Sequence, residues 1–184
     1  MIDIDIYECK NRFSATCSPR RESWSAFAVR LNNPDRVPLT ITDYEKLPKE
    51  RKSEIKDRGG YVGGVLRDGI RGKGHVESRC LVCLDADYAS KDFIEKVRET
   101  LPNTIWVVHS SFSHTPEKPR YRLVIPLKEV STEEEYSTIA YNIALKIGIE
   151  NFDKTSFQAE RIMFFPLALK TPNIFTFTTK SKIF

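Results

Sequence analysis

The sequence lacks the patterns of a membrane-spanning or secreted protein. No stretch approaches the roughly 20 apolar residues of a membrane span, and the first residues have neither the basic start nor the apolar run of a signal peptide. We therefore expect a cytoplasmic protein that makes no contact with a membrane. The chain has four cysteines, too few for a disulfide scaffold, and cytoplasmic thiols are normally reduced. We accordingly expect free thiols.

Three patterns of known sites are also missing. Cys80-Leu-Val-Cys83 has the spacing of half a zinc site, but it lies in an apolar run, and Cys9 and Cys17 are poorly spaced partners, so we expect no zinc. No Gly-x-x-x-x-Gly-Lys-Ser/Thr loop occurs, which excludes a nucleoside-triphosphatase motor. No His-hydrophobe-His triplet occurs either, which argues against a nuclease that pairs such a metal site with a tyrosine nucleophile.

The composition fits one folded domain. The chain has 184 residues, of which 40% are hydrophobic, and this is enough for one substantial core. Residues 1–80 carry 16 Lys and Arg against 12 Asp and Glu, whereas residues 81–184 carry 13 of each. We predict one domain over residues 1–184, with an N-terminal lobe at 1–75 that supplies the basic surface and a core at 76–184.

Hydrophobic patterning predicts interleaved strands and helices. We expect strands at residues 2–6, 26–31, 76–84, 105–108, 121–126, 162–165 and 174–177. We expect helices at residues 43–58 (interrupted near Pro48), 90–101 and 132–147. Because the two types alternate without repeats or a linker, the predicted class is α/β or α+β with a mixed sheet.

Glycine is scarce except in one segment. Seven of the eight glycines fall between Gly59 and Gly74, which predicts a loop or a hairpin whose backbone can approach a ligand. Arg67, Arg71 and Lys73 lie in or beside this segment, and we place them as candidate nucleic-acid contacts. The competing interpretation, a mobile hairpin, stays open.

The acidic pair Asp85 and Asp87 ends a continuous apolar strand. Alternation along a strand puts both carboxylates on one side, and such hard oxygen ligands suit Mg²⁺ or Mn²⁺. Asp3 and Asp5 have the same spacing, but isoleucines alternate with them along the whole strand, which indicates a solvated face. Asp85 and Asp87 are therefore the candidate metal ligands.

Two later segments carry further polar groups. Residues 109–122 lie between two predicted strands and offer hydroxyls, two histidines, Lys118, Arg120 and Arg122, a composition typical of a triphosphate cradle. Residues 152–166 contain Asp153, a candidate third carboxylate, and Arg161 at the start of an apolar strand.

The three segments in this order resemble the archaeo-eukaryotic primase superfamily. The resemblance rests on Asp-Ala-Asp at 85–87, on Thr-Pro-Glu-Lys-Pro-Arg-Tyr-Arg-Leu-Val-Ile-Pro-Leu at 115–127, and on Asp153 followed by Arg-Ile-Met-Phe-Phe-Pro at 161–166. It spans residues 59–178 and is closest to primase domains of phages, plasmids and mobile elements, which are often fused to a helicase. It implies a primase-like catalytic core with an RRM-like subdomain, and we expect the chain to be a fragment of a longer primase-helicase.

By this resemblance, Asp85, Asp87 and Asp153 bind catalytic Mg²⁺ or Mn²⁺. The family's middle motif is usually Ser-x-His, and alignment on Thr115 and Pro116 puts Phe112 at the place of that histidine. We assign the phosphate-binding role to His114, beside Ser111 and Ser113, and keep His109 as the alternative. Lys118, Arg120 and Arg122 would bind the triphosphate, and Arg161 the nucleic acid.

The implied function is template-directed nucleotidyl transfer. A 3′-hydroxyl would attack the α-phosphorus of a nucleoside triphosphate, and pyrophosphate would leave. The partners would be a single-stranded DNA template, nucleoside triphosphates and an attached or associated helicase. The alternative is an inactive primase-like domain that binds single-stranded nucleic acid, which the departure at Phe112 favours and the three carboxylates disfavour.

Overall fold

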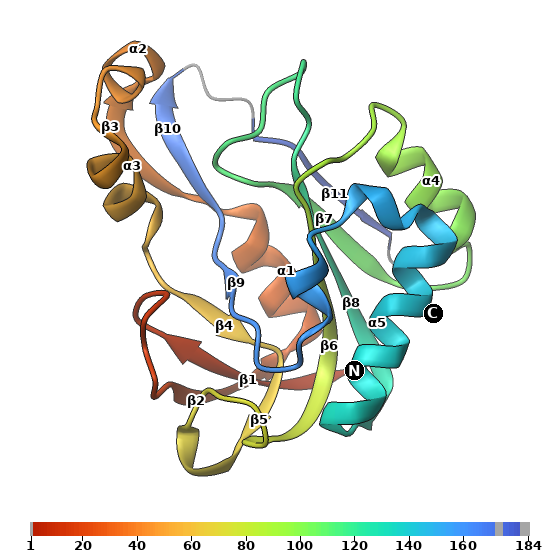
Figure 1. Cartoon of the computed structure of the whole chain (residues 1–184). Coiled ribbons are helices and arrows are strands. Elements are labelled where there is room, and N and C mark those ends of the chain that lie inside the picture. Colours follow the sequence, from red (N-terminus) through yellow and green to blue (C-terminus); the bar gives the residue numbers. More distant parts are fainter. Residues whose placement is uncertain (1, 172–174, 181–184) are drawn as a thin grey trace.

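The computed structural model describes residues 2–171 and 175–180 and has a mixed α+β fold (Figure 1). Its strands are β1 (Asp3–Cys9), β2 (Ser18–Ser23), β3 (Asp35–Thr40), β4 (Gly60–Val62), β5 (Gly64–Leu66), β6 (Val76–Ala86), β7 (Trp106–Ser110), β8 (Tyr121–Ser131), β9 (Met163–Phe164), β10 (Leu167–Thr171) and β11 (Phe177–Lys180). Its α-helices are α1 (Trp24–Asn32), α2 (Ile41–Glu45), α3 (Lys49–Lys56), α4 (Phe93–Thr100) and α5 (Glu133–Ile147). Its 3-10 turns are η1 (Arg67–Gly69), η2 (Ile149–Asn151) and η3 (Lys154–Phe157). The expected α+β class is confirmed.

An antiparallel sheet in the order β11-β7-β8-β6-β5 forms the centre of the molecule. Side chains alternate along β6, so Val82 and Leu84 face a core built with α4 and α5, and Leu81 and Cys83 face a core built with α1 and β1. Helices α4 and α5 lie on the right of the sheet in Figure 1. The same alternation places Asp85 on the face that the N-terminal elements cover.

The N-terminal elements form two smaller sheets. One has the antiparallel order β2-β1-β4-β9, and the other pairs β3 with β10 in parallel. Strands from the C-terminal part therefore complete both sheets, while β5 joins the central one. The two halves of the chain are interlocked rather than separate.

The expected strand at residues 26–31 is wrong, because these residues belong to α1. Trp24, Phe27 and Leu31 recur at helical spacing and are buried, and the hydroxyl of Ser23 caps the helix by accepting a hydrogen bond from the amide of Ala26. The apolar residues of this segment suit either structure, and packing on the sheet selects the helix. Strands β2, β3 and β10 were not anticipated.

Most other elements lie where the sequence predicts them. The charged segment 43–58 divides at Pro48 into α2 and α3, and α5 begins with a capping box between Thr132 and Glu135. Strands β1, β6, β7, β8 and β9 are confirmed, and so is helix α4, each within a few residues. Of the last expected strand, Phe177 begins β11, whereas residue 174 lies outside the described residues. No helix among the described residues is long and apolar enough to cross a bilayer.

The glycine-rich segment brings strands close to one another. A Cβ at Gly64 would lie 2.0 Å from the carbonyl oxygen of Ser78, and a Cβ at Gly60 would lie 2.4 Å from that of Met163. The close backbone approach predicted at these glycines is therefore to β6 and β9 of the protein itself.

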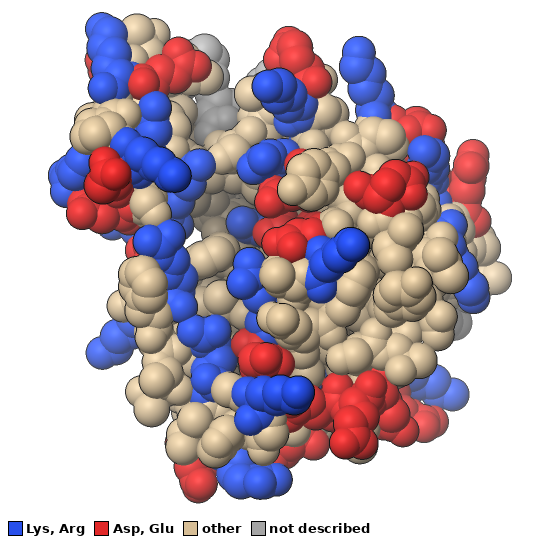
Figure 2. Space-filling view, viewed as in Figure 1, with Lys and Arg blue, Asp and Glu red and all other residues tan. Residues whose placement is uncertain are grey.

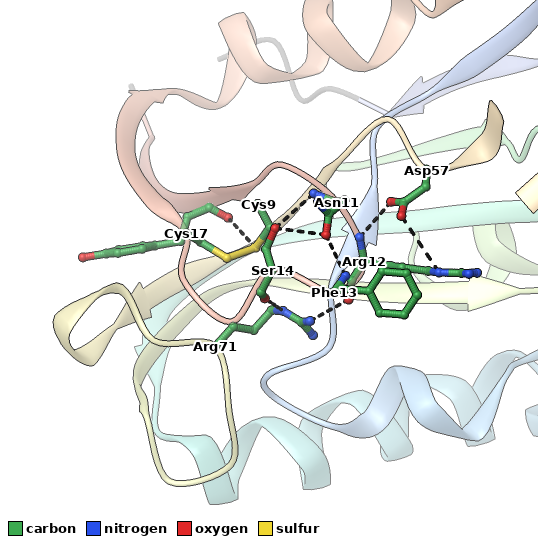
Figure 3. The surroundings of a disulfide bond; sticks show 9 residues. Cys9, Asn11, Arg12, Phe13, Ser14, Cys17, Asp57 and Arg71 are labelled. Atoms are coloured by element: carbon green, nitrogen blue, oxygen red, sulfur yellow. Dashed lines mark hydrogen bonds and ion pairs between the residues drawn. A yellow bond between two sulfur atoms is a disulfide. The ribbon is translucent and has the colours of Figure 1, made fainter. Parts of the chain in front are cut away.

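A disulfide bond joins Cys9 to Cys17, contrary to the expected free thiols (Figure 3). The antiparallel pairing of β1 with β2 brings the two Cα atoms within 4.4 Å. The guanidinium of Arg71 donates hydrogen bonds to the carbonyl oxygens of Ser14 and Arg12, at 3.0 and 2.7 Å (Figure 3). The disulfide and Arg71 thus hold the loop at residues 10–16 from both sides.

Candidate functional site

A charged cleft lies between the central sheet and the N-terminal elements. Its acidic side chains are Asp57, Asp85, Asp87 and Asp153, and its basic side chains are Arg12, Lys56, Arg120, Arg122 and Arg161. Its remaining wall consists of Ser53, Ser111, Phe112, Ser113, Phe164, Phe165 and Leu167. Figure 2 shows basic side chains gathered over α3 and β4, facing acidic ones near the centre of the view.

Backbone hydrogen bonds hold two of the predicted acids together. The amide of Asp153 donates to the carbonyl oxygen of Asp85 at 2.8 Å, and the amide of Asp85 donates to the hydroxyl of Ser156 at 2.9 Å. The carboxylate of Asp153 accepts hydrogen bonds from the amide and hydroxyl of Thr155, at 3.0 and 2.8 Å, and so caps η3. Residues far apart in the sequence are thus joined at the end of β6.

Each predicted acid faces an arginine. Asp87 lies 3.4 Å from Arg120, measured from carboxylate oxygen to guanidinium nitrogen. Arg122 is opposite Asp85 in the β6–β8 register, and this pair is 3.8 Å apart. Arg161 lies 3.8 Å from Asp153. Every one of these arginines was predicted from sequence, but their pairing with the acids was not.

The Asp85–Arg122 pair is nearly enclosed and incompletely satisfied. Burial raises the pKa of Asp85, against the opposing effect of the Arg122 charge, and the neighbouring carboxylates of Asp87 and Asp153 raise it further. The Oδ1 atom of Asp85 and the Nε atom of Arg122 are buried and have no hydrogen-bond partner. Buried polar atoms of this kind favour a bound ligand, since leaving them unpaired costs stability.

The carboxylates do not form a ready-made three-residue metal site. Within residues 2–171 and 175–180, no group of three or more His, Cys, Asp or Glu side chains is placed to hold a metal ion. The unpartnered oxygen of Asp85 nevertheless suits a cation, and Mg²⁺ commonly takes one or two carboxylates together with substrate phosphates. Asp85 and Asp87 fit that kind of site.

Neither histidine of the middle segment lines the cleft. His114 is buried, packs against the ring of Tyr121 at 4.9 Å between centroids, and accepts a hydrogen bond at Nδ1 from the amide of Arg120. His109 is fully buried in β7, and burial lowers its pKa to about 3. In this arrangement His114 and His109 support the loop and the sheet, and neither contacts the cleft.

Phe112 occupies the cleft wall and supports the N-terminal helices. Its ring packs at 5.1 Å, edge to face, on Tyr44 of α2, within a small core that includes Val37 and Leu167. The same core holds Ile55 of α3. Phe112, at the place where the resembled superfamily usually has a histidine, therefore provides the surface on which α2 and α3 dock.

Lys56, at the end of α3, is a cleft residue that the sequence analysis missed. Its Nζ atom donates a hydrogen bond to the hydroxyl of Ser113 at 2.7 Å and lies 5.8 Å from the centre of the Phe112 ring. Desolvation lowers its pKa, and the nearby charge of Arg120 lowers it further. Arg12, Ser53 and Asp57 were missed as well. No motif marks them, since only the docking on Phe112 and the disulfide loop bring them to the cleft.

Besides His114, four predicted site residues lie away from the cleft. Lys118 is exposed on its loop, and Arg67 forms an ion pair with Glu77 at 3.8 Å. Arg71 uses its guanidinium to hold the disulfide loop, and Lys73 lies in the exposed turn before β6. The cleft brings together Ser111, Ser113, Arg120, Arg122, Arg161 and the three acids.

One comparison with known proteins gives a match. The family model described as VapE N-terminal domain matches residues 2–183. No curated protein matches the chain, and no solved structure does.

Proposed function

The chain belongs to the VapE N-terminal domain family, and we propose that it is a nucleotidyl-transfer domain of the primase or primase-polymerase type. Proteins of the VapE type are found in phages and plasmids and are related to primase-helicases. A role associated with the replication of a mobile element follows from this membership. Membership of the archaeo-eukaryotic primase superfamily and catalysis of nucleotide transfer are the further steps that we propose.

The observation that carries the proposal is the pairing of three acids with three arginines in one cleft. Asp85, Asp87 and Asp153 face Arg122, Arg120 and Arg161 at 3.4 to 3.8 Å, without a direct hydrogen bond. A nucleoside triphosphate would give the arginines phosphate oxygens and leave the carboxylates to a divalent cation. Both sets of charges would then be satisfied in shorter contacts than they make with each other.

The basic and the acidic side chains would have different roles in the reaction. Arg120, Arg122 and Lys56 would bind the phosphates, with the hydroxyl of Ser113 beside them. Asp85 and Asp87 would hold Mg²⁺ or Mn²⁺, which when bound supplies charge neutralisation and a more acidic attacking hydroxyl. Asp153, fixed to the backbone of Asp85, would keep its carboxylate beside the attacking 3′-hydroxyl as pyrophosphate leaves.

The decisive experiment measures incorporation of labelled nucleotides on primed and unprimed single-stranded templates. We expect the parent to incorporate nucleotides only with Mg²⁺ or Mn²⁺ present, and Asp85→Asn/Asp87→Asn to fall to background. Asp3→Asn/Asp5→Asn is the matched control, because that pair has the same spacing but lies on β1 and forms ion pairs with Arg21. Equal incorporation by the parent and by the Asp85→Asn/Asp87→Asn variant would overturn the assignment.

A second candidate is a domain that binds single-stranded nucleic acid without catalysis. Two observations favour it. The acids are already paired with arginines, and both histidines are buried and support the loop and the sheet. It predicts that the parent binds single strands and incorporates nothing. It also predicts that neutralising Asp85 and Asp87 strengthens binding, because arginines released from carboxylates are free for phosphates.

A further inference from the structure

A second hollow adjoins the charged cleft at Asp153. Its wall includes four aromatic side chains, Tyr88, Tyr141, Phe152 and Phe157, together with Glu150 and Lys154, and it shares Asp153 with the charged cleft. Tyr88 is 70% exposed and Tyr141 is 46% exposed, which is unusual for large rings beside a charged site. We call this region the aromatic hollow.

The aromatic hollow is held in place by its surroundings. The amide of Tyr88 donates to the carbonyl oxygen of Asn151 at 3.1 Å, and the buried side chain of Asn151 accepts from the amide of Ser90 at 2.8 Å. Tyr141 of α5 meets the ring of Phe157 edge to face, with centroids 5.7 Å apart. The backbone of Tyr88 and the ring of Tyr141 are thus held in place before any ligand arrives.

The position of the aromatic hollow relative to the cationic side chains of the charged cleft indicates which ligand it would bind. In a phosphoryl transfer the attacking and leaving oxygens lie on opposite sides of the phosphorus. The cationic groups that would take the leaving pyrophosphate, Lys56 and Arg120, line the cleft but not the hollow. The attacking strand would then approach away from Lys56 and Arg120, through the aromatic hollow that adjoins Asp153.

We propose that the aromatic hollow binds the 3′-terminal base of a single-stranded nucleic acid whose 3′-hydroxyl is to be extended. The base stacks on the exposed rings of Tyr88 and Tyr141, and Lys154 contacts the adjoining phosphate. Aromatic faces accept every base, which suits a site that must hold any terminal nucleotide. The proposal rests on the proposed function, because it assigns the hollow to the strand that the cleft would extend.

The test uses a short single-stranded oligonucleotide that carries 2-aminopurine either at its 3′ end or in its middle. Stacking on an aromatic ring quenches this fluorophore, so we expect quenching by the parent at the 3′ position and little in the middle. Tyr88→Ala and Tyr141→Ala should each weaken strand binding about tenfold, and the two Tyr→Phe variants should restore it. Leu145→Ala is the matched control, because Leu145 is exposed on the same helix but does not line the hollow.

The binding readout is independent of nucleotide incorporation, so the two proposals can fail separately. Position-specific quenching without incorporation supports strand binding in the hollow and contradicts the catalytic proposal. Incorporation by the parent, with equal strand affinity in parent and Tyr→Ala variants, overturns the assignment of the hollow alone. Equal quenching at both positions, or no binding of the oligonucleotide, also overturns it. Since both tyrosines are exposed, both alanine variants should stay folded in thermal melting, and Tyr88→Ala, which removes no ring contact, should match the parent.

Discussion

The amide of Asp153 donates a hydrogen bond of 2.8 Å to the carbonyl oxygen of Asp85, so the third acid of the candidate site is joined directly to the first. This bond forms because the chain after α5 returns to the end of β6. There the hydroxyl of Ser156 also accepts a hydrogen bond from the amide of Asp85. The positions of both carboxylates therefore depend on backbone contacts of the segment at residues 153–156. The role of this segment in positioning the carboxylates can be tested by substituting a side chain of the segment that binds no ligand.

Ser156→Ala should lower stability and nucleotide incorporation together. Ser156 is buried, and its loss leaves the amide of Asp85 without a partner, which costs about 1–3 kcal/mol. The measurements are urea unfolding and incorporation at saturating nucleotide. Ser25→Ala, at an exposed serine of α1, should change the free energy of unfolding by less than about 0.5 kcal/mol. Unchanged stability and incorporation in Ser156→Ala would contradict the positioning role.

Lys56→Met should raise the KM for the nucleoside triphosphate about tenfold or more, because it removes a charge-assisted phosphate contact worth about 1.5–3 kcal/mol. Its fold should survive, since Lys56 is exposed at the end of α3. Lys49→Met removes one positive charge from the exposed start of the same helix and should leave the KM unchanged. Equal KM values for the parent and for Lys56→Met would exclude Lys56 from the phosphate site.

His109 should make the protein sensitive to acid. Its pKa in the folded state is about 3, below the ordinary value of 6.5, so the unfolded chain takes up the proton first and stability falls as the pH drops below 6.5. The loss at pH 5 should be about 2 kcal/mol relative to pH 7, at about 1.4 kcal/mol for each pH unit below 6.5. His109→Gln should flatten the dependence of unfolding free energy on pH, whereas His75→Gln should keep it. A parent with constant stability from pH 7 to pH 5 would contradict this account.

Reduction of the Cys9–Cys17 bond should destabilise the protein by about 2–3 kcal/mol, since the open loop regains conformational freedom in the unfolded state. The urea midpoint, measured with and without a thiol reductant, checks this. Cys9→Ser/Cys17→Ser should show the lower midpoint under both conditions. A parent that is insensitive to the reductant would indicate that the bond is absent in solution.

Local patterns were sufficient for much of the central sheet and for part of the candidate site. The apolar run before Asp85 predicted β6, and the hydrophobic pattern of residues 132–147 predicted α5, because neighbouring residues specify these elements. Cleft residues such as Asp153 and Arg120 were anticipated through the order of motifs. The segment at residues 26–31 was assigned wrongly, because apolar residues at short spacing suit a strand and a buried helix alike.

The sequence by itself determined the class of the fold and the acidic and basic groups that gather near the end of β6. The tertiary structure alone decided which groups share the cleft: it buried His109, turned His114 against Tyr121, and brought Lys56 to Ser113 through the docking of α3 on Phe112. The physical reason is that a residue's position along a strand or helix follows from its neighbours in the chain. The groups it meets across the cleft follow from long-range packing, which no local pattern records.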